Sequence, residues 1–494
     1  MPDRTAGSSA TTTERALRAI RDLRAKVDVL ERRQGEPVAI VGMGCRFPGA
    51  ADLSGFWDLL VRGADPLGPV PQDRWNIDSL YNPDPQARGK TVSREGGYLP
   101  NLDRFDADFF GIPPREAPFI DPRQRLVLET AWEALEDAGI PADRLAGSLT
   151  SVVLGTLTND YNQLITADDR WVSAATGTGT SNSIIANRLS YVLDLHGPSL
   201  TVDTACSGSL LALHLACQTL RNGEATVALC GGGAGDLGPA PGICFSRMGA
   251  LSPRGRCHTF DTASDGMARS EGAGMVVLKL LSQAEADGDR IYALIRASAV
   301  NHDGRSNGIA APNGQAQERL LREAYGKAGI APGRVQYVEA HGTGTIVGDR
   351  IELQALAKVL GTDRAPGHGC VVGSVKSNIG HTESAAGIAG IIKTALALKH
   401  RLLPGNLHFE TPHPALSEAP FALEVRTAAG PFPAPGEPIV AGVSAFSFGG
   451  ANVHVILEEA PAAIAPAAVA SPAVSVPAED AAAYVLPLSA KSPD

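Results

Sequence analysis

The sequence lacks the features that mark membrane, secreted and nucleic-acid-binding proteins. No apolar run approaches the roughly 20 residues that a membrane-spanning helix needs. Residues 1–13 are polar and hold no apolar signal core, so we expect a cytoplasmic protein without a membrane partner. The net charge is −10 and no block of lysine and arginine interrupts the body of the chain, which argues against nucleic acid as a partner.

Cysteines are few and scattered. There are seven of them, an odd number, and no pair has Cys-x-x-Cys spacing. Neither a disulfide framework nor a zinc site is therefore expected, and a reducing compartment fits this usage. Most of the thiols should be small buried hydrophobic side chains, but Cys206 has surroundings that need another explanation.

The chain between Pro37 and Glu458 alternates short apolar segments with longer amphipathic ones. The pattern predicts strands at 38–41, 151–154, 200–202, 227–229, 275–280, 292–300, 335–340 and 453–457, and helices at 126–138, 210–221, 315–328 and 351–359. Such alternation is typical of an α/β fold with buried sheets. A chain of 494 residues suggests one large or duplicated domain with appendages, although no repeat is visible at the residue level.

Both ends of the chain differ from this body. Residues 13–34 carry a heptad seam through Ile20, Leu23, Val27 and Leu30. About three heptads are too few for a stable lone helix, so we expect a two-stranded coiled coil on a dimer axis that also meets a partner protein. The alternative is a solvated amphipathic lead-in. Residues 459–483 are rich in alanine and proline, as in an extended linker, and order is expected to resume at 484–488.

The segment LTVDTACSGSLLALHLACQTLRNGE (200–224) places Cys206 between a strand and a helix that begins near Ser207. The dipole and free N–H groups of a helix N-terminus favour the thiolate, which is the reactive form. A buried structural cysteine is the alternative. The small residues around Cys206 would give a bulky acyl substrate access, which favours a nucleophile.

Two histidines occupy similar positions at strand ends. His341 lies in VEAHGTGTIVGDRIE (338–352), and His381 lies with Lys376 in GSVKSNIGHTESAAGIAG (373–390). One such histidine is more often structural, but two in loops of glycine, serine and threonine favour catalysis. A Gly-Gly turn in SAFSFGGANVH (444–454) offers backbone N–H groups for an oxyanion hole.

The motifs DTACSGS, EAHGTGT, GSVKSNIGHTE and SFGGANVH resemble the four hallmark motifs of β-ketoacyl synthases. The resemblance extends from Pro37 to Glu458 and includes PVAIVGMGCRFPGA (37–50), the run 104–140, GRCHTFDTASDG (255–266) and NHDGRSNGIAAPNG (301–314). This set is similar to the ketosynthases of modular type I polyketide synthases. The final YVLPLSAKS (484–492) resembles the start of a linker towards an acyltransferase domain, so the chain is expected to be the front of a longer polypeptide.

The resemblance implies a thiolase fold, five-layered αβαβα from two similar halves, preceded by a short N-terminal coiled-coil helix. It divides the chain into a docking segment (1–36), a half with the nucleophile (37–285), a half with both histidines (286–458) and a linker (459–494). It also implies an obligate homodimer.

The resemblance further implies a role for each motif residue. Cys206 would accept an acyl chain from an upstream acyl carrier protein, and His341 and His381 would stabilise the enolate of a malonyl-type extender on a second carrier. Lys376 would support the histidines electrostatically. The other implied groups are an oxyanion hole from the backbone N–H groups of Cys206 and Phe448, and Thr343 and Thr345 as ligands of the phosphopantetheine arm. No metal or bound cofactor is implied, because the carrier delivers the arm.

Three departures from the commonest family pattern are Gly208, Arg350 and residues 267–270, none of which replaces a reacting group. We expect Asp349 to cap the helix that follows it. The rivals are a thiolase-type transferase, a fatty-acid ketosynthase, and a non-elongating ketosynthase-like scaffold or acyl relay. The intact set of Cys206, His341, His381 and Lys376 favours a competent condensing enzyme.

Overall fold

The computed structural model describes residues 17–21, 24, 33–157, 159–362, 364, 369–417, 423–434 and 436–461. Ten strands form one sheet in the order β10-β9-β13-β14-β8-β1-β7-β6-β4-β5. The N-terminal half of this sheet consists of β1 (Val38–Arg46), β4 (Thr150–Gly155), β5 (Ser199–Val202), β6 (Val227–Ala234) and β7 (Gly272–Leu280). The C-terminal half consists of β8 (Ala293–His302), β9 (Tyr337–Glu339), β10 (Val371–Gly373), β13 (Val440–Phe446) and β14 (Ala451–Glu459).

The two half-sheets repeat one topology. In the first, β4 is parallel to β5 and β6, while β7 is antiparallel to β6 and β1. In the second, β9 is parallel to β10 and β13, while β14 is antiparallel to β13 and β8. The two half-sheets are joined where Val38–Ile40 of β1 pairs antiparallel with 293–295 of β8. The predicted two similar halves are thus present as a duplication of strand order that leaves no repeat at the residue level.

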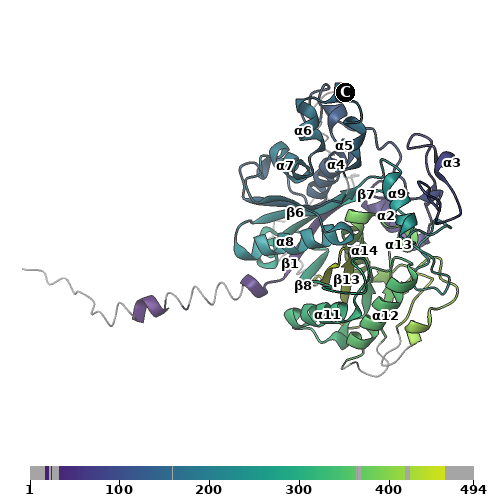
Figure 1. The fold of residues 1–494 in the computed structure, drawn as a ribbon. Coiled ribbons are helices and arrows are strands. Elements are labelled where there is room, and N and C mark those ends of the chain that lie inside the picture. The colour runs from purple at the N-terminus through teal and green to yellow at the C-terminus, as the bar shows by residue number, and fades with distance from the viewer. Residues whose placement is uncertain are drawn as a thin grey trace, which may run out of the picture.

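Helices fill three layers around the half-sheets (Figure 1). The outer layer of the first half contains α4 (Pro122–Asp137) and α7 (Asn182–Val192), and that of the second half contains α11 (Gly314–Ala328) and α12 (Ile346–Leu360). Between the half-sheets lie α8 (Gly208–Asn222) and α14 (Ala386–His400), which contact each other. The expected five layers are confirmed.

The middle layer explains the apolar surface of its helices. Every residue of α14 from Ala386 to Leu398 is buried, because the helix is covered on all sides, and α8 buries Leu210, Leu213 and Leu220 in the same way. The helices approach closely at Gly387, where an added Cβ would lie 2.9 Å from the Cβ of Leu210. Their N-termini are therefore held together, which matters for the site described below.

The other helices and strands are short. They are α2 (Leu53–Arg62), α3 (Ile77–Leu80), α5 (Asp160–Ile165), α6 (Ala174–Thr180), α9 (Ala240–Arg247), α10 (Leu281–Asp287) and α13 (Lys376–Ile379), with strands β2 (Gly68–Pro69), β3 (Glu95–Gly96), β11 (Leu402–Leu403) and β12 (Gly430–Pro431). The helices of the described residues include none long and apolar enough to cross a membrane.

Some element boundaries differ from the prediction. Helix α12 begins at Ile346, with Thr345 as its N-cap, so the prediction that Asp349 caps this helix is wrong. Asp349 instead lies inside the first turn, where its carboxylate accepts hydrogen bonds from the N–H groups of Gly344 and Phe260. Strands β10 and β13 and helix α14 were not predicted, because fully buried elements carry no polar alternation to reveal their period.

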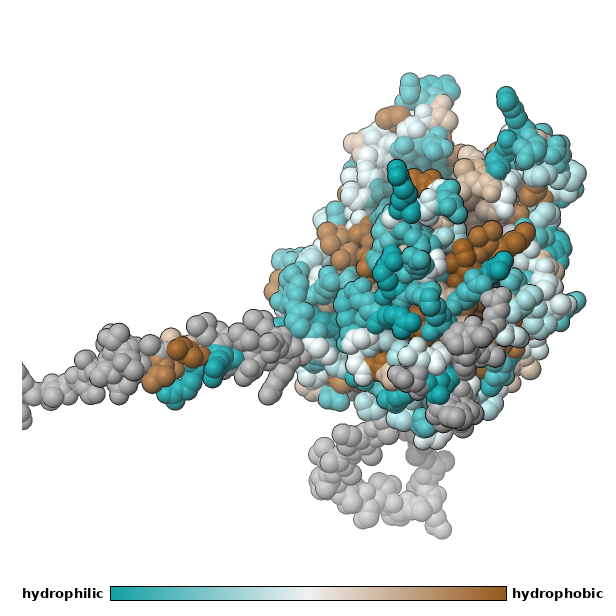
Figure 2. Space-filling model, turned by 60° about the horizontal axis from the view of Figure 1, so that its bottom comes forward, coloured by the Kyte–Doolittle hydropathy of each residue, from teal (hydrophilic) through white to brown (hydrophobic). Residues whose placement is uncertain are grey.

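The terminal predictions fall largely outside the described residues. Leu17–Arg21 are helical, with hydrophobic and hydrophilic side chains on different sides (Figure 2), but most of the predicted coiled coil (13–34) lies outside the described residues. So does the linker beyond residue 461. Residues 33–36 contact the body, where the Gln34 side-chain amide donates to Asn222 (3.0 Å).

Candidate active site

Cys206 lies at a strained turn between β5 and α8. The turn is a 3₁₀ segment, η4 (Ala205–Ser207), which runs directly into the N-terminus of α8 as predicted. Ala205 has φ 51°, a left-handed conformation that costs energy for any residue with a Cβ. This elbow projects the nearly buried Cys206 at the start of a rigid middle-layer helix.

His381 lies at the equivalent turn of the second half. It precedes η6 (Glu383–Ala385), which leads into α14 just as η4 leads into α8. Glu383, the first residue of η6, has φ 46° and matches Ala205. The duplicated topology therefore brings both elbows to the centre of the molecule, where η4 and η6 contact each other.

His341 follows β9 and is held by the carboxylate of Glu352. Glu352 accepts from the N–H groups of His341 and Gly342, each at 2.8 Å. Gly342 has φ 41°, and a Cβ there would lie 2.7 Å from Thr259 Cγ2, so glycine is required. The imidazole ring lies 5.6 Å, centroid to centroid, from that of His381.

The three groups converge on one pocket of about 380 Å³. Its lining includes Cys206 from the first half and His341 and His381 from the second. Lys376 lies behind this wall, in the buried helix α13. All four predicted catalytic side chains are thus brought together, although up to 175 positions separate them in the chain.

Burial keeps the thiol of Cys206 protonated. It raises the pKa of Cys206 to about 12, and the charge of Glu383 adds to this effect. The charge of Lys376 and the N–H groups of Phe448 and Cys206 itself act in the opposite direction but do not outweigh burial. The effect of burial on this thiol is therefore larger than the expected thiolate-favouring effect of the helix N-terminus.

Burial also keeps both histidines neutral. The pKa of His341 and that of His381 lie well below the ordinary value, mainly because of desolvation and further because Lys376 is nearby. Desolvation likewise lowers the pKa of Lys376, while the charge of Glu339 raises it. A neutral imidazole carries one N–H group, and beside a lysine this group can donate a hydrogen bond to an oxyanion as it develops.

The tautomer of His381 follows from its hydrogen bonds. The N–H of Glu383 donates to Nδ1 of His381 at 3.0 Å. In a neutral imidazole the other nitrogen, Nε2, then carries the proton. His381 is thereby prepared as a hydrogen-bond donor.

The β13–β14 hairpin contributes Phe448. Its two glycines use their N–H groups within the turn, where Gly449 donates to Ser447 Oγ and Gly450 to the Ser447 carbonyl. Both Gly-Gly N–H groups are therefore already used within the turn. The N–H of Phe448 acts on the thiol of Cys206 and lowers its pKa, and Phe448 is the residue whose N–H the family resemblance implied for an oxyanion hole.

The pocket mouth combines two threonines with an apolar rim. Thr343 and Thr345 line the pocket, and their hydroxyl groups are hydrogen-bonded at 2.9 Å. Exposed side chains of Met248, Ile346 and Val347 surround them. Sequence reasoning missed this rim, as it missed the role of Glu352, although an acidic residue on an otherwise apolar helix was a visible signal.

The described residues include no group of three or more His, Cys, Asp or Glu side chains that could hold a metal ion.

Comparison with known families gives two matches: the β-ketoacyl synthase N-terminal domain over residues 35–284 and the C-terminal domain over 292–410. The chain belongs to the β-ketoacyl synthase family.

Relatives of this β-ketoacyl synthase include subunits of a polyketide synthase. One subunit of the phenolphthiocerol/phthiocerol polyketide synthase of Mycobacterium tuberculosis is 51% identical over 86% of the chain and 27% of its own length. Another subunit of that synthase is 49% identical over 86% of the chain and 23% of its own length. The chain thus spans about a quarter of these relatives. It is a ketosynthase of the polyketide synthase type, an acyl-transferring condensing enzyme, rather than a thiolase.

Solved structures agree with this assignment. The oxazolomycin ketosynthase domain of Streptomyces albus matches with a TM-score of 0.82 at 41% identity, over 86% of this chain and 74% of that one. The module 6 ketosynthase of the bacillaene synthase from Bacillus subtilis matches with 0.81 at 41% identity, over 86% and 72%.

Proposed function

We propose that this ketosynthase elongates an acyl chain by decarboxylative condensation, with Cys206 as nucleophile and His341 and His381 as the groups that stabilise the carbanion. The observation that carries the proposal is the convergence of these three side chains on one pocket from both halves of the fold. A scaffold or acyl relay would not need this complete set.

In the loading step, Cys206 Sγ attacks the thioester of an acylated carrier protein. The new acyl–Sγ bond forms while the acyl–pantetheine bond breaks, and the thiol proton leaves with the pantetheine sulfur. The backbone N–H groups of Cys206 and Phe448 stabilise the tetrahedral oxyanion. The N–H of Phe448 already acts on this sulfur in the resting enzyme.

In the condensation step, a malonyl-type extender on a second carrier loses carbon dioxide. His341 and His381 donate to the thioester carbonyl as it becomes an enolate oxygen, and Lys376 supports them. The carbanion attacks the acyl-Cys206 thioester: the new carbon–carbon bond forms while the acyl–Sγ bond breaks, and the released Cys206 thiolate takes up a proton from solvent. Thr343 and Thr345 hold the pantetheine arm, which both carriers supply.

The sheet edge and the relatives of the chain support proposals about its partners. Strand β5 lies at one edge of the sheet, and Leu200 on it and Tyr191 in α7 are exposed. An uncovered edge strand with apolar neighbours favours pairing with a second copy across a two-fold axis, so we propose a homodimer. We further propose a cytoplasmic protein, carrier proteins as partners and a following acyltransferase domain. The four-segment division of the chain stays a prediction.

The deciding assay mixes the chain with an acylated and a malonylated carrier protein and follows the β-ketoacyl product by mass spectrometry. Cys206→Ala should abolish acyl loading and condensation while the protein stays folded. Cys206→Gln should stop condensation but retain malonyl decarboxylation, because the histidines remain.

Labelling of the nucleophile needs one precaution, because Cys244 is an exposed thiol. The acyl thioester should therefore be offered to a Cys244→Ser background. Preferential labelling of Cys217 or Cys230, which are fully buried, would show that the assignment of Cys206 is wrong.

A further inference from the structure

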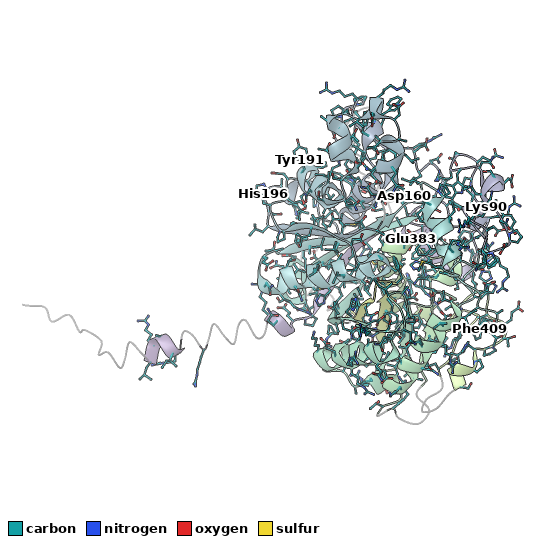
Figure 3. The ribbon with its side chains drawn as sticks, viewed as in Figure 1. Lys90, Asp160, Tyr191, His196, Glu383 and Phe409 are labelled. Carbon is teal, nitrogen blue, oxygen red and sulfur yellow. The ribbon has the colours of Figure 1, made fainter. Side chains whose placement is uncertain are left out.

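One guanidinium lies between two buried carboxylates behind His381. Arg269 donates from Nη1 to Asp236 at 2.5 Å and from Nε to Glu383 at 2.7 Å. All three side chains are nearly excluded from solvent. In Figure 3 the label of Glu383 lies just below that of Asp160, whose pKa is raised by burial and also by the charge of Glu383. We call Arg269, Asp236 and Glu383 the Arg269 triad.

The main chain joins this triad to His381. Arg269 pairs with His381 in a parallel β-bridge. The N–H of Ser270 donates to the His381 carbonyl at 3.0 Å, and the N–H of His381 donates to the Ala268 carbonyl at 2.7 Å. The segment that carries Arg269 therefore fixes the backbone of His381.

Glu383 joins the triad to the imidazole ring itself. Its N–H is the donor to Nδ1 of His381, and this peptide is held in the unfavourable left-handed region. The ion pair with Arg269 secures the Glu383 side chain. By contrast, Nδ1 of His341 is buried with no hydrogen-bond partner among the described residues. Of the two histidines that line the pocket, His381 is therefore the one whose tautomer is set by a main-chain hydrogen bond.

The same cation lies behind the other side of the pocket. The Arg269 guanidinium lies 5.9 Å from the centroid of the Phe245 ring, and Phe245 contacts the Phe448 ring edge-on at 6.0 Å. Burial raises the pKa of Asp236 to about 7, which means that burying its charged carboxylate costs free energy. A merely structural cluster would not need to touch both sides of the pocket.

We propose that Asp236, Arg269 and Glu383 are positioning residues that hold His381 as its Nε2–H tautomer, in the orientation that extender decarboxylation requires. This inference rests on the proposed function only for the role of His381. The triad touches no reacting atom and acts through the His381 ring.

The kinetic test measures malonyl decarboxylation and acyl loading separately. Glu383→Ala and Arg269→Lys should lower decarboxylation about 10- to 100-fold, as expected for a misplaced catalytic group, while loading of Cys206 stays close to the wild-type rate. The ammonium of lysine cannot reproduce the planar guanidinium of Arg269, which donates to two carboxylates in fixed directions. Glu383→Gln should restore most of the decarboxylation, because its amide oxygen still accepts from Arg269 Nε.

A matched control is present elsewhere in the chain. Lys279 lies between Asp287 and Asp289, at 2.7 and 2.6 Å, and touches neither the pocket nor His381. Asp289→Asn should leave the ratio of the two rates unchanged. Equal losses of loading and decarboxylation in Glu383→Ala, or a Glu383→Gln variant no better than Glu383→Ala, would overturn the inference.

A spectroscopic readout does not depend on turnover. In ¹⁵N-histidine-labelled protein, His381 should be the Nε2–H tautomer in wild type and a mixture in Glu383→Ala. A wild-type spectrum in that variant overturns the positioning role. His381→Ala, measured alongside, separates the two proposals: if it still decarboxylates the extender, the proposed function fails while the tautomer result still decides on the triad.

Discussion

At the scale of single residues, burial determines the resting protonation states of this pocket. Cys206 is a thiol, and His341 and His381 are neutral imidazoles, because desolvation disfavours every charged form. The charge of Lys376, behind the pocket wall, lowers the pKa of Cys206 without outweighing burial. The pocket is thus suited to stabilise negative charge that appears only during the reaction.

Replacing His341 should separate the two half-reactions. His341→Ala should lower decarboxylation and condensation by about 10²–10³, the usual cost of losing one preorganised donor, with a smaller effect on acyl loading. Stopped-flow measurement of carbon dioxide release, beside mass spectrometry of acyl-Cys206, gives both rates. Unchanged extender decarboxylation would rule out the role.

A histidine outside the pocket makes stability depend on pH. His454 is fully buried between Ser444 and Tyr325, and burial lowers its pKa from 6.5 to about 3. Between pH 7 and pH 5 the unfolded imidazole takes up a proton and the folded one does not. The free energy of unfolding should therefore fall by about 2 kcal/mol from this residue as pH drops.

The variant His454→Gln isolates that contribution. Its stability at pH 7 should be lower than wild type, because buried hydrogen bonds are lost. Its further loss between pH 7 and pH 5 should be smaller by the His454 share. Urea unfolding of both proteins at the two pH values gives the difference, and identical pH dependences would contradict the assignment.

At the scale of elements, the paired elbows before α8 and α14 decide where the chemistry takes place. Each begins with a non-glycine residue at positive φ, Ala205 or Glu383. The two helix N-termini are linked by a hydrogen bond from the Ile388 N–H to Ser209 Oγ at 3.0 Å. Any shift of one helix start should thus be felt at Cys206 and His381 together.

The contact between β4 and α8 offers a test of this coupling. A Cβ on Gly155 would lie 2.3 Å from the Ser209 nitrogen and 2.4 Å from the Gly208 carbonyl carbon, so Gly155→Ala must displace the start of α8. We expect a lower unfolding temperature and slower acyl loading of Cys206. Gly177→Ala in α6 is the control, since among the described residues no atom beyond its chain neighbours and its own helix backbone lies within 4 Å of the added Cβ. An equal effect from both variants would refute the prediction.

At the scale of the whole molecule, the proposed dimer interface and the predicted docking helix belong to different parts of the chain. The interface proposed at β5 belongs to the body, whereas the heptad seam lies in residues 13–34. Only Leu17–Arg21, Arg24 and residues 33–34 of that segment are described, and Leu17 and Ile20 are half exposed there. An apolar stripe this short needs a partner surface to be buried.

Deleting residues 1–34 should leave a folded, dimeric enzyme. Condensation of substrates supplied in excess should persist, while transfer from an upstream polypeptide at low concentration should weaken. That deficit should shrink as salt rises if the arginines attract an acidic partner. Transfer rates of both chains across ionic strength measure this, and equal rates at every salt concentration would show that the helix is only a lead-in.

The sequence alone determined the family of this protein and its candidate catalytic residues. Cys206, His341, Lys376 and His381 lie in short motifs of small residues that resemble those of β-ketoacyl synthases, and such motifs can be read without knowledge of the fold. The alternation of strands and helices likewise predicted the α/β class, because a period is a property of neighbouring residues.

Only the tertiary structure decided how those groups are arranged and ionised. The Arg269–Glu383 pair joins residues 114 positions apart, and the neutral state of the histidines depends on burial by distant elements. The duplicated half-sheets and the buried helix α14 were equally invisible, since a fully covered element shows no polar face. Protonation, tautomer and symmetry are set by long-range packing, and no local pattern encodes them.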